Sequence, residues 1–90
     1  YDEAYKSLFK YLKEKNFTEI RKWVTHNNDI SPDILFANLY AMSVSQLEPN
    51  SVAQLVLILA DYQYKQAFVS NTEINITACL VEIMAGCAFK

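Results

Sequence analysis

The chain has a single glycine, two prolines, one histidine and two cysteines among its 90 residues. Loops that cradle phosphate groups need several glycines, because the backbone must approach the anion closely. Gly86 alone provides no such loop, and its place near the end of an expected helix favours a role in ending that helix. The sequence therefore excludes nucleotide hydrolysis within these residues.

The residue types that build metal and catalytic sites are equally scarce. Cys79 and Cys87 lie eight positions apart. On one helix this is a rise of about 12 Å, which exceeds the ~7 Å between α-carbons that a disulfide tolerates. Without a histidine at ligand spacing they form no zinc site, so we expect two buried, reduced thiols. His26 is expected at the carboxyl end of a helix, where the helix dipole favours its charged form. We expect no catalytic residue, no metal and no cofactor.

Positive charge is scarce after the first quarter of the chain. Six of the eight Lys and Arg residues lie within the first 22 positions, and the formal net charge is −2. A nucleic-acid-binding domain normally presents a strongly basic face, so nucleic acid is not the expected ligand. Residues 31–40, at the place of a recognition helix, contain neither Lys nor Arg, which argues against a helix-turn-helix.

No segment indicates a membrane or a secretion signal. The longest apolar run, about residues 52–60, is far shorter than the ~20 residues of a spanning helix. The chain opens on Tyr1 without an apolar signal segment or an initiator methionine. We therefore expect Tyr1 to be a cut point in a longer intracellular protein.

Hydrophobic residues at helical spacing are abundant along the chain. Its residues are 52% hydrophobic, and their spacing predicts helices over Asp2–Glu14, Phe17–His26 and, after an N-cap at Ser31, to about residue 44. Start signals at residues 48–51 and 70–73 open two more helices, which run to about residues 69 and 85. We expect an all-α, compact bundle of about five helices, with residues 1–90 forming one domain.

Residues 51–84 are the most informative segment. The helix expected here is apolar on almost every side from residue 52 to residue 60, and such a helix needs cover on every side. We expect it to be the central strut of the domain, with Leu59 in the core, and in addition a candidate for part of a surface that another subunit covers. Tyr64 and Phe68 are expected to fill the core.

The same segment resembles a known family. Residues 60–65 (ADYQYK) are similar to the Ala-Asp-x-x-aromatic-basic run in the C-terminal helical domain of sliding-clamp loader small subunits. Residues 71–76 (NTEINI) are similar to the opening of the last helix of that domain. These proteins are the replication factor C small subunits and their tailed-phage counterparts, and the phage branch is the more similar. A weaker resemblance covers residues 16–22.

The resemblance implies a function in assembly. The C-terminal domains of this family form a collar that holds AAA+ ATPase modules in a ring, which loads the sliding clamp onto DNA during replication. The implied partners are other clamp-loader subunits, while the clamp and primer–template DNA would be contacted only by domains outside these 90 residues. The implied compartment is the cytoplasm, or the host cytoplasm for a phage protein.

A stripe on the fourth expected helix is the predicted subunit interface. Gln54, Ile58, Asp61 and Lys65 follow one another at intervals of three or four residues and mix polar with apolar side chains. Tyr62 is added because tyrosine is favoured at interfaces. Two other classes stay open: a helical adaptor that binds a partner's helix in a groove, and a regulatory domain attached to an enzyme.

Overall fold

The computed structural model describes residues 2–90; Tyr1, the expected cut point, lies outside the described residues. Five helices follow one another along the chain: α1 (Asp2–Glu14), α2 (Phe17–His26), α3 (Pro32–Gln46), α4 (Pro49–Gln66) and α5 (Thr72–Gly86). Within residues 2–90 the only β pairing is an isolated antiparallel bridge between Leu47 and Phe89. The prediction of an all-α bundle of five helices is confirmed.

Side-chain caps mark the starts of α2, α3 and α5. The side chains of Asn16 and Ser31 accept the backbone N–H of Glu19 and Ile34, at 3.2 Å and 3.4 Å. At α5 the cap is Asn71, whose side chain accepts the N–H of Ile74 at 3.1 Å, and not Ser70 as the capping-box spacing suggests. An amide oxygen is at least as good an N-cap as a hydroxyl, so the boundary moves by one residue.

α4 ends earlier than its sequence pattern predicts. Its last helical residue is Gln66, because the N–H groups of Ala67 and Phe68 turn back to the carbonyls of Tyr64 and Lys65, at 3.2 Å and 2.9 Å. These bonds span three residues and tighten the chain into a turn. Phe68 therefore lies beyond the helix, and its side chain is 73% exposed. The expectation that Tyr64 and Phe68 fill the core is wrong, since Tyr64 is also largely exposed.

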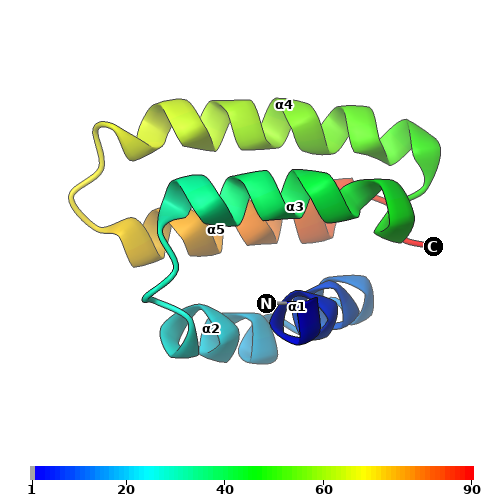
Figure 1. Ribbon diagram of the computed structural model, residues 1–90, viewed down its shortest axis with the longest axis horizontal. Helices are drawn as coiled ribbons and strands as arrows, with labels where there is room; N and C mark the ends of the chain where they lie inside the picture. Colours follow the sequence, from blue (N-terminus) through cyan, green and yellow to red (C-terminus); the bar gives the residue numbers. More distant parts are fainter. Residues whose placement is uncertain (1) are drawn as a thin grey trace.

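The helices form two layers. α3, α4 and α5 run along the long axis of the molecule, and α1 and α2 lie together against one side of them (Figure 1). α5 packs against α1, α2 and α4, whereas α4 packs against α3 and α5. The central helix is therefore α5. The expectation that α4 is the central strut is wrong, because Leu57, in the middle of its apolar stretch, is 67% exposed.

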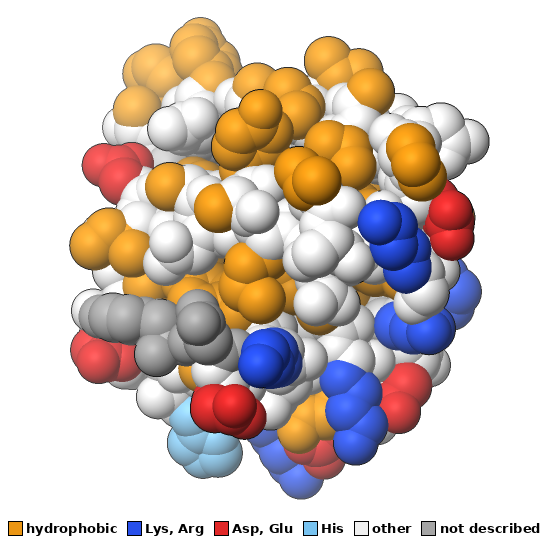
Figure 2. Space-filling view, turned by 45° about the vertical axis from the view of Figure 1, so that its right-hand side comes forward, with side chains coloured by type: hydrophobic (Ala, Val, Ile, Leu, Met, Phe, Trp, Pro, Cys, Tyr) orange, Lys and Arg blue, Asp and Glu red, His pale blue; other side chains and the backbone are white. Residues whose placement is uncertain are grey.

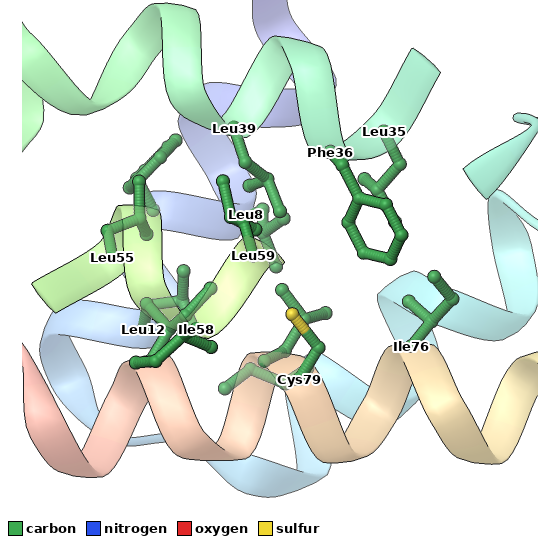
Figure 3. Close-up of a cluster of buried hydrophobic side chains, with 14 of the residues drawn as sticks. Leu8, Leu12, Leu35, Phe36, Leu39, Leu55, Ile58, Leu59, Ile76 and Cys79 are labelled. Carbon is green, nitrogen blue, oxygen red and sulfur yellow. The ribbon is translucent and has the colours of Figure 1, made fainter. Parts of the chain in front are cut away.

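One hydrophobic core joins all five helices. Ile58 and Leu59 point from α4 into the cluster that also contains Leu8 and Leu12 of α1 (Figure 3). The fully buried large side chains of this core are Tyr5, Leu8, Phe9, Leu12, Ile20, Leu39, Leu47, Leu55, Leu80 and Ile83. Side chains from both layers contribute to this core, which holds α4 against α5. The outer side of α4 remains exposed.

The last residues tie the chain end to the start of α4. The N–H of Glu48 donates to the carbonyl of Ala88 at 2.9 Å, and the N–H of Ala88 donates to Oγ of Ser51 at 2.8 Å. The N–H of Lys90 donates to the carbonyl of Gln46 at 3.0 Å. These bonds close the α3–α4 corner and hold Phe89 against the core.

The Leu59→Ala variant tests the core assignment of α4. Leu59 is buried, so the change should lower the free energy of unfolding by about 2–5 kcal/mol through lost apolar burial and a residual cavity. Leu57→Ala, two residues earlier on the exposed side, should change it by less than about 0.5 kcal/mol. Urea unfolding followed by circular dichroism measures both values. Equal effects of the two changes would contradict the orientation of α4.

Candidate association surfaces

The structure divides the five predicted interface residues into two groups. Gln54, Asp61 and Lys65 are exposed on α4. Ile58 and Tyr62 are buried, with 5% and 7% of their surface exposed. They lie three and seven residues after Leu55, which is fully buried, so all three side chains point to the core. The prediction that Ile58 is the apolar centre of an interface stripe is therefore wrong. Tyr62 is also buried, so it offers little surface to another subunit.

Two of the three exposed members of the stripe form a local ion pair. Nζ of Lys65 lies 2.9 Å from a carboxylate oxygen of Asp61, and both side chains are about half exposed. Hydrogen bonding to Asp61 raises the pKa of Lys65. The same ammonium group lies 4.6 Å from the centre of the Tyr62 ring. Burial, followed by the charge of Glu82, raises the pKa of Tyr62. These contacts order one flank of α4 but create no reactive group.

A group of exposed apolar side chains on α3 and α4, which the sequence analysis did not predict, forms a different surface. We define the α3–α4 face by five exposed large side chains: Tyr40, Val44, Val56, Leu57 and Tyr64. Figure 2 shows apolar side chains gathered over the upper half of the molecule, where α4 and α3 lie in Figure 1, and Lys and Arg mainly in the lower half.

The α3–α4 face carries little charge. α3 and α4 contain only three charged side chains, those of Asp33, Asp61 and Lys65. A shallow groove of about 260 Å³ runs between the two helices, with Tyr40 on one wall and Val56 on the other. The apolar character of residues 52–60 was the sequence signal for this face. The pattern did not indicate which side of the helix is the exposed one.

A second surface is the α2–α5 groove, a depression of about 810 Å³ between α2 and α5. It is lined by Ile74, Ala78 and Val81 of α5 and by Phe17 and Arg21 of α2. Phe17 is 44% exposed. Tyr62 of α4 and two acids of α5, Glu73 and Glu82, also line the groove.

The α4–α5 corner joins the two surfaces through a polar network. Asn75 is buried and donates from Nδ2 to Oε1 of Gln66 at 2.9 Å and to the carbonyl of Tyr62 at 3.4 Å. Nε2 of Gln66 donates to Oγ1 of Thr72 at 3.1 Å. A satisfied buried amide of this kind fixes the orientation of two helices, because breaking it leaves polar atoms without partners.

The thiols lie inside the core. Cys79 and Cys87 are free and buried, as predicted. Burial raises the pKa of Cys79 to about 12 and also raises that of Cys87. Thiols in this state are poor nucleophiles, because the thiolate is the reactive form.

Across residues 2–90, no group of three or more His, Cys, Asp and Glu side chains lies close enough to hold a metal ion. None of the helices described has the length and apolar character needed to cross a membrane. The chain matches no family model, and no curated protein matches it.

Proposed function

We propose that the chain is a protein–protein association domain, and more specifically the C-terminal collar domain of a sliding-clamp loader small subunit. The observation that carries the proposal is the α3–α4 face, on which large apolar side chains lie in water. The charges bordering it are few: Asp33 lines the groove, and Nζ of Lys90 donates to the carbonyl of Val44 at 3.2 Å. Covering one of the large apolar side chains contributes roughly 1.5–3 kcal/mol. Contiguous exposed apolar surfaces mark interaction sites in folded proteins.

The positions of the family-like residues support the finer assignment. Residues 60–65 end α4, with Asp61, Tyr64 and Lys65 exposed, and residues 71–76 begin α5, with Asn71 as its cap. Asn75 joins the two segments through its bond to the carbonyl of Tyr62. The two motifs thus meet at one rigid corner, which suits a domain that holds a fixed place in a ring.

In this role the domain is a scaffold without catalytic residues. Its partners are other clamp-loader subunits, and ATP, the sliding clamp and primer–template DNA are handled by AAA+ domains outside these 90 residues. The complex acts in the cytoplasm, or in the host cytoplasm if a phage encodes it. The α3–α4 face supplies the contacts that keep the ATPase modules together.

A replacement experiment tests this function. A clamp-loader small subunit whose own collar has been removed is fused to the 90-residue chain, and ring assembly is followed by size-exclusion chromatography with light scattering. The fusion should assemble into rings and recover clamp-stimulated ATP hydrolysis, while a fusion carrying Leu57→Glu should not. A fusion that remains monomeric at every concentration would refute the collar assignment.

A further inference from the structure

We draw no further inference here: the strongest candidate, the exposed apolar outer side of α4 around Leu57, carries none, because nothing in the structure shows what covers it.

Discussion

Replacing Ile58 with glutamate is expected to unfold the domain. Ile58 is 5% exposed and points into the core shared by α1, α4 and α5, so the change removes apolar burial and places a carboxylate among apolar side chains. Removing a core aliphatic side chain costs about 2–5 kcal/mol, and an unpaired buried charge adds several more. A domain of this size has roughly 5–15 kcal/mol of stability in total.

The Tm should therefore fall by about 20 °C or more, or the chain should be unfolded at room temperature. Thermal melting followed by circular dichroism measures the loss, and the fluorescence of Trp23, the single tryptophan, reports on the core at the same time. Leu57→Glu is the matched control: it is the neighbouring residue on the same helix, largely exposed, and should leave the Tm nearly unchanged. An Ile58→Glu variant as stable as the parent would show that α4 presents its other side to the core.

Trp23→Ala should produce the second large effect, by separating α1 from α2. The indole N–H of Trp23 donates to the carbonyl of Ala4 at 2.8 Å, and its ring lies 5.8 Å from the ring of Tyr5, between centroids. The side chain is buried, so its removal should cost about 3–5 kcal/mol. Urea unfolding followed by circular dichroism gives the value.

Trp23→Phe separates packing from hydrogen bonding in the same contact. It keeps an aromatic ring against Tyr5 but loses the donor to Ala4, so its cost should be closer to about 1–2 kcal/mol. If both substitutions at Trp23 cost less than about 1 kcal/mol, the first two helices do not depend on this residue for their docking.

The sequence predicts much of the fold because the helices are marked locally. The N-cap at Ser31, the proline after it and the apolar spacing of residues 2–14 depend only on neighbouring residues, and the structure agrees with them. The C-terminal end of α4 and the start of α5 differ from the prediction. Asn71 caps α5 in place of Ser70, and the chain turns at Ala67 before the apolar pattern ends.

The surface was less predictable than the helices. Residues 52–60 are apolar on almost every side, so their spacing contains no sign of which side meets the core. That choice depends on α5, which takes the central position by packing against three helices. Ile58 and Leu57 are neighbours of similar size, yet one is buried and the other is 67% exposed. Of the predicted interface residues, Gln54, Asp61 and Lys65 are exposed, whereas Ile58 and Tyr62 are buried.

The most direct test of the central claim is sedimentation equilibrium of the chain and its Leu57→Glu variant over a wide range of concentrations. The claim predicts that the apparent mass of the parent rises with concentration and that this rise is lost in the variant. Thr18→Glu, which adds the same charge at an exposed position of α2, should behave like the parent. A parent chain that stays at its 10.3 kDa monomer mass at millimolar concentration, or a variant that associates as the parent does, would contradict the claim that this face is an association surface.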